Sequence, residues 1–150
     1  MEFLHLAWSD FDEAVGKLAE LIEKDITTLH NPEGRIYIAG QPRGGLFLAV
    51  ALSHKLDIEL FMTPQVVNLT DTLIWIDDIL DTGKTADIVS DAFKDVDLIF
   101  LPYVWVSKHP ERKSVPYTLP TFADTWVVFP WENTSKAVAS REDFLQRRKL

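Results

Sequence analysis

The chain contains no cysteine, which excludes disulfide bonds, thiolate catalysis and cysteine metal ligands together. Its histidines show none of the H-x-x-H or H-x-x-x-H spacings of transition-metal sites; they are His5, His30, His54 and His109. No run of about 18 apolar residues is present, so the sequence predicts no transmembrane segment. The N-terminus carries Glu2 and His5 instead of a basic region before an apolar core, which argues against a signal peptide. We therefore expect a cytoplasmic protein.

Basic residues are scarce relative to acidic ones: 15 lysines and arginines stand against 23 aspartates and glutamates, for a net charge of −8. A protein that binds nucleic acid nonspecifically does so by neutralising phosphates, so this balance argues against nucleic acid as a partner. At 150 residues, 47% of them apolar, the chain can bury a core of its own. We expect a single domain over 1–150.

Apolar residues recur at spacings of three and four between Phe11 and Ile26, which predicts a helix with Ser9 as its N-cap. The pattern further predicts helices at 46–56 and about 85–93, and strands at 35–39, 57–62, 73–77 and 98–106. Such alternation is typical of an α/β fold, a parallel sheet with helices on both faces. Ligands bind at the carboxyl ends of the strands in such sheets, so we expect the loops 40–45 and 77–85 to face one cleft.

The last third of the chain has a different composition. Five prolines break it into short extended pieces: Pro102, Pro110, Pro116, Pro120 and Pro130. We interpret about 107–135 as a small proline-rich hood beside a core of about 7–106. A short terminal helix is expected at about 140–149.

The most informative segment is the run from Leu73 to Ala86. An apolar strand leads into Asp77 and Asp78, and Asp81 precedes a Thr-Gly-Lys-Thr turn at the start of a helix. Helix N-termini favour phosphate through unpaired N–H groups and the positive end of the helix dipole. Paired carboxylates suit hydroxyl groups or a hard cation such as Mg²⁺. The combination indicates a phosphorylated sugar as ligand.

Two simpler interpretations compete for this segment. Gly83, Lys84 and Thr85 match the end of a nucleotide-binding P-loop, but the first glycine of that motif would fall at Asp78. A capped βα turn explains one polar residue, whereas three aspartates in five positions repel one another unless a ligand or cation compensates.

The segment resembles the 5-phosphoribosyl-1-pyrophosphate (PRPP) motif of type I phosphoribosyltransferases, Asp-Asp-x-x-Asp-Thr-Gly-x-Thr. The resemblance implies that Asp77 and Asp78 lie along the ribose hydroxyls, with Asp78 nearer a Mg²⁺ ion. It implies that Asp81 lies beside the base as the catalytic residue that handles a purine ring proton. The 5′-phosphate would be bound by Thr82, Gly83, Lys84 and Thr85.

A second loop, Gln41-Pro42-Arg43-Gly44-Gly45, also follows a predicted strand. Paired glycines let a backbone approach an anion closely, although Gly-Gly turns without a ligand are also common. In the family resembled, an Arg-Gly or Lys-Gly loop binds pyrophosphate, often with a strained peptide bond just before the basic residue. Arg43 and Gly44 match that loop.

A third group resembles the purine-salvage branch of the family, in particular the xanthine–guanine (hypoxanthine) phosphoribosyltransferases. The resemblance implies that Lys108 contacts the purine 6-oxo group, that Trp126 in Asp-Thr-Trp stacks on the ring, and that the backbone of Val127 meets the base edge. If the resemblance is set aside, the simpler interpretation of Lys108 is a solvated lysine after a strand, and that of Trp126 is a core aromatic. The family also places an acid near Glu132.

The function implied is transfer of ribose 5-phosphate from PRPP to guanine, xanthine or hypoxanthine, with Mg²⁺ as cofactor and release of pyrophosphate. Many family members close a long loop over the site, but here only the 12 residues 61–72 are available, without arginine or lysine. That departure favours a rival hypothesis, a PRPP or nucleotide sensor with little turnover. A transferase for a pyrimidine or another acceptor would leave Lys108 and Trp126 unexplained. We expect a homodimer or homotetramer because of exposed aromatics in the last third.

Overall fold

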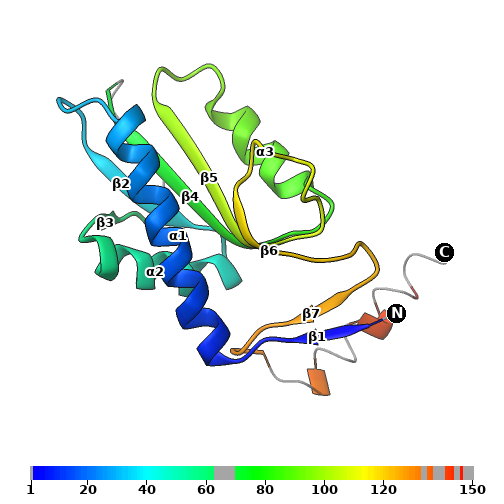
Figure 1. Ribbon diagram of the computed structural model, residues 1–150. Helices are drawn as coiled ribbons and strands as arrows, with labels where there is room; N and C mark the ends of the chain where they lie inside the picture. Colours follow the sequence, from blue (N-terminus) through cyan, green and yellow to red (C-terminus); the bar gives the residue numbers. More distant parts are fainter. Residues whose placement is uncertain (1, 63–69, 133–134, 137–140, 144–145, 147–150) are drawn as a thin grey trace.

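A computed structural model of the chain describes residues 2–62, 70–132, 135–136, 141–143 and 146 (Figure 1). Its centre is a five-stranded, all-parallel sheet in the order β3-β2-β4-β5-β6. The strands are β2 (Ile36–Gly40), β3 (Glu59–Leu60), β4 (Thr72–Leu80), β5 (Ile99–Ser107) and β6 (Tyr117–Pro120). The helices are α1 (Trp8–Leu29), α2 (Gly44–Leu56) and α3 (Lys84–Phe93). The predicted α/β fold with a parallel sheet is confirmed.

Helices cover both faces of the sheet, as alternate side chains of β4 show. Ile74 and Ile76 are fully buried in the larger core cluster with residues of α1 and α2. Trp75, between them, points to the other face and packs in a second cluster with Ala86 of α3. Side chains that alternate across a strand explain why this apolar run shows no polar face in the sequence.

Some boundaries differ from those predicted. The N-cap of α1 is Ala7, not Ser9, because the Ala7 N–H donates to the Asp10 carboxylate at 2.7 Å and the helix begins earlier. β4 continues through the acidic pair to Leu80, which lies opposite Ser107 in β5. The long partner strand β5 keeps β4 extended beyond the predicted end at 77.

The segment 107–135, interpreted as a hood, contributes strands to two different sheets. β6 extends the main sheet at the edge of β5, whereas β7 (Trp126–Val128) pairs in parallel with the N-terminal strand β1 (Phe3–His5). The two strands form a separate small sheet, visible in Figure 1 below the main one. The predicted terminal helix at 140–149 and most of the loop 61–72 lie outside the described residues.

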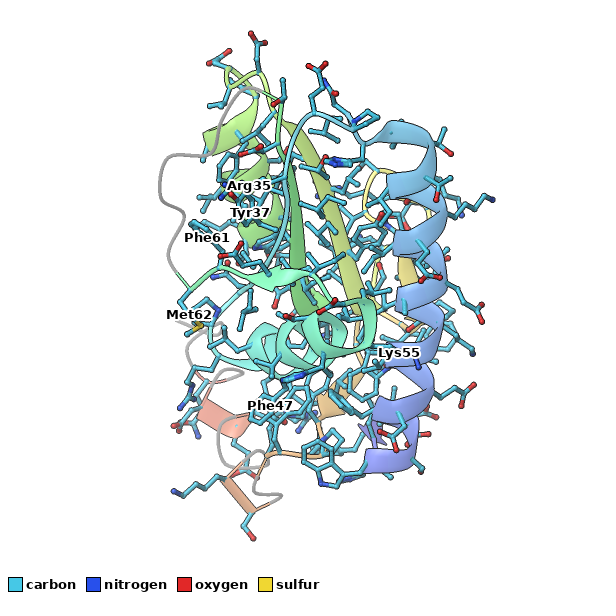
Figure 2. The ribbon with its side chains drawn as sticks, turned by 90° about the vertical axis from the view of Figure 1, so that its left-hand side faces the viewer. Arg35, Tyr37, Phe47, Lys55, Phe61 and Met62 are labelled. Atoms are coloured by element: carbon cyan, nitrogen blue, oxygen red, sulfur yellow. The ribbon has the colours of Figure 1, made fainter. Side chains whose placement is uncertain are left out.

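At the opposite edge of the main sheet, Tyr37 of β2 packs edge-on against Phe61, which follows β3, with ring centroids 4.8 Å apart (Figure 2). Within the described ranges, no helix combines the length and apolar character needed to cross a membrane.

Candidate functional site

The chemically unusual loops lie together at the carboxyl edge of the main sheet. The Gln41 N–H after β2 donates to Ile76 O of β4 at 2.8 Å, and the Lys108 N–H after β5 donates to Leu80 O at 2.9 Å. These bonds hold the loop after β2 beside Ile76, just before Asp77 and Asp78, and the loop after β5 against the end of β4. The predicted convergence is therefore confirmed in part, for the loop 40–45 and the Asp77–Asp78 end of the loop 77–85.

The loop 41–45 (the glycine loop) and the carboxylates Asp77 and Asp78 (the acidic pair) are in direct contact. A Cβ on Gly44 would lie 1.8 Å from Oδ2 of Asp78, and one on Gly45 would lie 2.5 Å from the carbonyl oxygen of Ile76. Glycine at both positions is what allows this approach. The peptide bond between Pro42 and Arg43 is cis. An anion held by this loop would therefore lie beside the carboxylates of β4.

The contact predicts different outcomes for neighbouring glycines. Gly44→Ala collides with the end of a side chain, so we expect the protein to fold with Asp78 displaced. Affinity for PRPP, the ligand that the motif predicts, should fall at least about tenfold. The matched control is Gly16→Ala in α1, where a Cβ meets nothing within 4 Å and helix propensity improves by about 0.5–1 kcal/mol. Calorimetric titration with PRPP and thermal unfolding test both. Unchanged PRPP affinity in Gly44→Ala would contradict the assignment of this contact to the site.

Asp77 and Asp78 repel each other in a poorly solvated place. Asp77 is only 9% exposed, and its Oδ1 accepts the Asp78 N–H at 2.8 Å. Burial and the charge of Asp78 together raise the pKa of Asp77 to about 8, and burial also raises the pKa of Asp78. A bound cation or hydroxyl donors would relieve this repulsion.

The acidic pair offers the hard oxygen donors that Mg²⁺ prefers, and a bound cation would favour the ionised carboxylates. In the part of the chain that the structure describes, no group of three or more histidine, cysteine, aspartate or glutamate side chains could hold a metal alone. Mg²⁺ commonly binds through one or two carboxylates together with substrate oxygens, so the pair fits a magnesium ion brought with a phosphorylated ligand.

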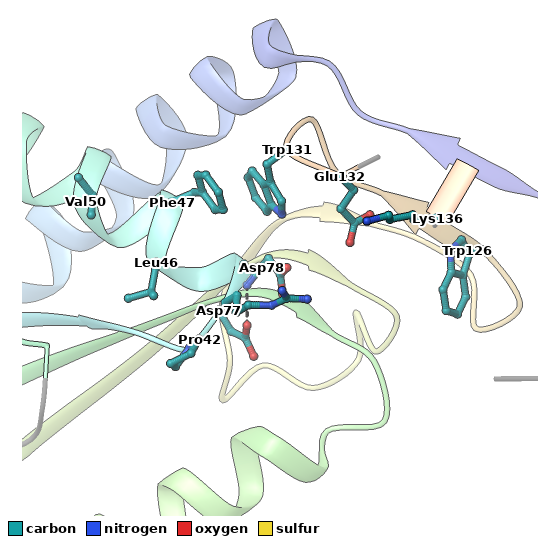
Figure 3. A pocket seen from close by; sticks show the side chains of 12 residues that line it. Pro42, Leu46, Phe47, Val50, Asp77, Asp78, Trp126, Trp131, Glu132 and Lys136 are labelled. Atoms are coloured by element: carbon teal, nitrogen blue, oxygen red, sulfur yellow. Dashed lines mark hydrogen bonds between the residues drawn. The ribbon is translucent and has the colours of Figure 1, made fainter. Parts of the chain in front are cut away.

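A cavity of about 1100 Å³ opens next to this contact (Figure 3). Five of the residues predicted for the site line this cavity: Arg43, Gly44, Asp77, Asp78 and Trp126. Its wall also includes Phe47 and Trp131, whose rings stack in parallel with centroids 4.4 Å apart. The sequence did not single out Trp131 for the site, although Pro-Trp-Glu lies next to the predicted Trp126 segment.

Glu132 and Lys136 bring further charge to the cavity. Glu132 accepts the Phe129 N–H at 3.0 Å and thereby closes a turn. Its pKa is raised by burial and by the charge of Asp78, while Arg43 acts in the opposite direction. The Glu132 carboxyl therefore lies within the electrostatic fields of Asp78 and Arg43, where sequence reasoning assigned it no role.

Asp81 and Lys108 form an ion pair at 3.2 Å between Oδ1 and Nζ. The Lys108 side chain is 7% exposed and that of Asp81 is 45% exposed, so the ammonium is enclosed and the carboxylate is open to a ligand. Neither is among the described residues that line the cavity. Val127 is buried in β7 opposite Leu4, which leaves its predicted backbone contact with a base a prediction.

The predicted phosphate turn leads directly into α3. Gly83 is the N-cap of that helix with φ of 85°, a left-handed conformation that favours glycine. The Lys84 N–H donates to Thr82 Oγ1 at 3.3 Å. Arg112, a residue that the sequence analysis missed, lies against Gly83 and pairs with Asp87 of α3. His109, by contrast, pairs with Glu111 at 3.1 Å on an exposed turn.

Comparison with known proteins gives a consistent result. No protein-family profile matches the chain. The chain is 27% identical over 117 residues to a xanthine-guanine phosphoribosyltransferase of Desulfotalea psychrophila, an alignment that covers 65% of this chain and 70% of the relative. A purine phosphoribosyltransferase from Pyrococcus horikoshii superposes with a TM-score of 0.67 at 28% identity, over 89% of this chain and 96% of the other.

A xanthine-guanine-hypoxanthine phosphoribosyltransferase from Helicobacter pylori superposes with a TM-score of 0.71 at 21% identity, over 93% of this chain and 99% of the other. At that identity the likeness concerns the fold. The parallel sheet and its flanking helices match those of these structures.

Proposed function

We propose that this chain, a relative of the purine phosphoribosyltransferases with their type I fold, transfers ribose 5-phosphate from PRPP to a 6-oxopurine and releases pyrophosphate. The observation that carries the proposal is the contact between the Gly44 backbone and the Asp78 carboxylate. The contact brings the loop 41–45, to which we assign the diphosphate, beside the carboxylates to which we assign the ribose hydroxyls. PRPP carries its diphosphate on C1 of the ribose, next to the 2- and 3-hydroxyl groups, so one ligand would reach both.

Each loop would hold one part of PRPP. Arg43 and the N–H groups of the glycine loop bind the diphosphate, Asp77 and Asp78 accept hydrogen bonds from the ribose hydroxyls, and the turn 82–85 binds the 5′-phosphate. Mg²⁺, held by Asp78 together with ligand oxygens, would neutralise charge on the departing pyrophosphate. The ribose gains oxocarbenium character in the transition state, so fixed carboxylates near it stabilise the developing positive charge.

The ion pair of Asp81 and Lys108 would receive the base. The Lys108 ammonium donates hydrogen bonds and accepts none, so it favours a 6-oxo group over a 6-amino group. Asp81 orients the purine and accepts a ring proton as the new bond to ribose forms. Trp126 lines the cavity beside the acidic pair and would stack on the ring.

The direct test is incubation of the protein with PRPP, Mg²⁺ and one base at a time, with pyrophosphate and nucleotide measured. We expect product with guanine, xanthine or hypoxanthine and little with adenine, uracil or orotate. Asp81→Asn should lower turnover about a hundredfold, the scale of lost acid–base catalysis. Full turnover in that variant would remove the proposed role of Asp81, and product with orotate alone would refute the purine assignment.

One observation favours a second function, a PRPP or nucleotide sensor: the loop 61–72 offers no arginine or lysine to the pyrophosphate. No product with any base, together with PRPP binding measured by calorimetry, would support the sensor. We also propose self-association as a dimer or tetramer, because Trp8 and Phe122, outside the cavity, are 52% and 76% exposed. Sedimentation analysis that finds only monomer would contradict it.

A further inference from the structure

Arg112 lies where the 5′-phosphate of the ligand is expected, on a loop to which the family motif assigns no phosphate contact. We propose that its guanidinium binds this phosphate together with the turn 82–85, an inference that rests on the proposed function. Nη1 of Arg112 would lie 2.6 Å from a Cβ placed on Gly83, and Nη2 pairs with Asp87 in the first turn of α3. Figure 1 shows the loop between β5 and β6 beside α3.

The backbone around Arg112 is fixed by short-range hydrogen bonds. The Arg112 N–H donates to His109 O at 2.9 Å, and the His109 N–H donates to Ser107 Oγ at 3.0 Å. One residue earlier, the Lys108 N–H is bonded to Leu80 O at the end of β4. The turn that carries Arg112 is therefore tied to the ends of both central strands, and the guanidinium is held at a defined place beside the phosphate turn.

The present partner of Arg112 is a weak one. The Asp87 side chain is 60% exposed, and ion pairs between exposed side chains contribute little to stability. A phosphate carries more charge than a carboxylate and accepts two parallel hydrogen bonds from a guanidinium. A phosphate bound at Gly83 would therefore compete well for Arg112, whose side chain is 28% exposed.

Gly83 leaves the space that such a contact requires. It has no side chain, and its φ of 85° turns the chain sharply into α3. The loop after β5 would then bind both ends of a nucleotide, with Lys108 at the base and Arg112 at the phosphate. Mononucleotides would gain affinity over nucleosides through a residue four positions beyond the one that selects the base.

The test compares ligands with and without the phosphate in wild type and Arg112→Gln by calorimetry. We expect affinity for guanosine 5′-monophosphate to fall at least about tenfold, the scale of a lost charge-assisted hydrogen bond. Affinity for magnesium pyrophosphate, which the Arg43–Gly44 loop would bind, should stay unchanged. Lys113 is an exposed neighbour, so Lys113→Gln is the matched control and should leave the affinity for both ligands unchanged.

Asp87→Asn distinguishes phosphate binding by Arg112 from a purely structural role of the Arg112–Asp87 ion pair in holding α3. If Arg112 binds phosphate, this variant keeps or improves affinity for the nucleotide because the guanidinium loses its competitor. Equal losses in Asp87→Asn and Arg112→Gln, or no loss in Arg112→Gln, would overturn the inference. These readouts are binding constants, so a wild type that binds the nucleotide yet shows no transfer would refute the proposed enzyme without affecting this result.

Discussion

Asp77→Asn should make the free protein more stable at neutral pH while it lowers kcat/KM for PRPP about a hundredfold. The loss of activity follows because a charge-assisted hydrogen bond to a ribose hydroxyl is worth about 1.5–3 kcal/mol, and about 2.7 kcal/mol corresponds to a hundredfold. The gain in stability follows because Asp77 is 9% exposed and lies beside a second carboxylate. The asparagine Oδ1 can still accept the Asp78 N–H, so local geometry is kept.

The pH dependence has a definite sign. Burial and Asp78 raise the pKa of folded Asp77 to about 8, whereas an unfolded aspartate titrates near about 3.9. The folded form therefore retains a proton that the unfolded form has lost, and wild-type stability falls as the pH rises from about 4 to about 8. Asp77→Asn should flatten this decline and gain on the order of 4 kcal/mol at neutral pH, because about three pH units separate the unfolded pKa from pH 7 and each unit is worth about 1.4 kcal/mol; the measurement is made without divalent cations.

Denaturant unfolding across that pH range, for wild type and variant, measures the effect. Asp91→Asn removes an exposed carboxylate and should leave both the pH slope and the activity as they are. A variant that is less stable than wild type at neutral pH would show that burial beside Asp78 does not raise the pKa of Asp77. Retained activity in Asp77→Asn would show that Asp77 makes no important contact with the ribose.

Much of this architecture follows from local sequence signals. The apolar run before Asp77 and the helical spacing after Lys84 predict a βα unit, and parallel pairing then brings its loop to the same edge as the glycine loop. Contacts between residues distant in sequence were not predictable in this way. The small sheet joins Phe3–His5 to Trp126–Val128, and neither three-residue strand has a periodicity that identifies its partner.

Arg112 illustrates the same limit at the site. In the sequence it belongs to a short charged stretch between two prolines, which is typical of a solvated turn. Its position against Gly83 depends on the bond from Lys108 to Leu80 and on the turn back to His109. Those contacts exist only once β4 and β5 are paired, so no local pattern could have indicated them.

Lys108→Gln should reduce the discrimination between hypoxanthine and adenine by at least about tenfold. The Lys108 ammonium is 7% exposed and 3.2 Å from Asp81, so it is enclosed as a donor at the place where the base is expected. An amino group opposite it would leave a buried donor unsatisfied, which costs about 1–3 kcal/mol. Glutamine both donates and accepts, so it can pair with either substituent. The measurement is kcat/KM for each base at saturating PRPP.

Lys108→Arg is the matched variant because it keeps the charge and still accepts no hydrogen bond. We expect its turnover to fall, since the larger guanidinium does not fit the enclosed place of the ammonium, while its preference for hypoxanthine over adenine persists. If both variants lose the preference equally, shape and not hydrogen-bond direction sets the specificity. If neither loses it, the base lies elsewhere, and Asp81 with Lys108 is a structural ion pair at the ends of β4 and β5.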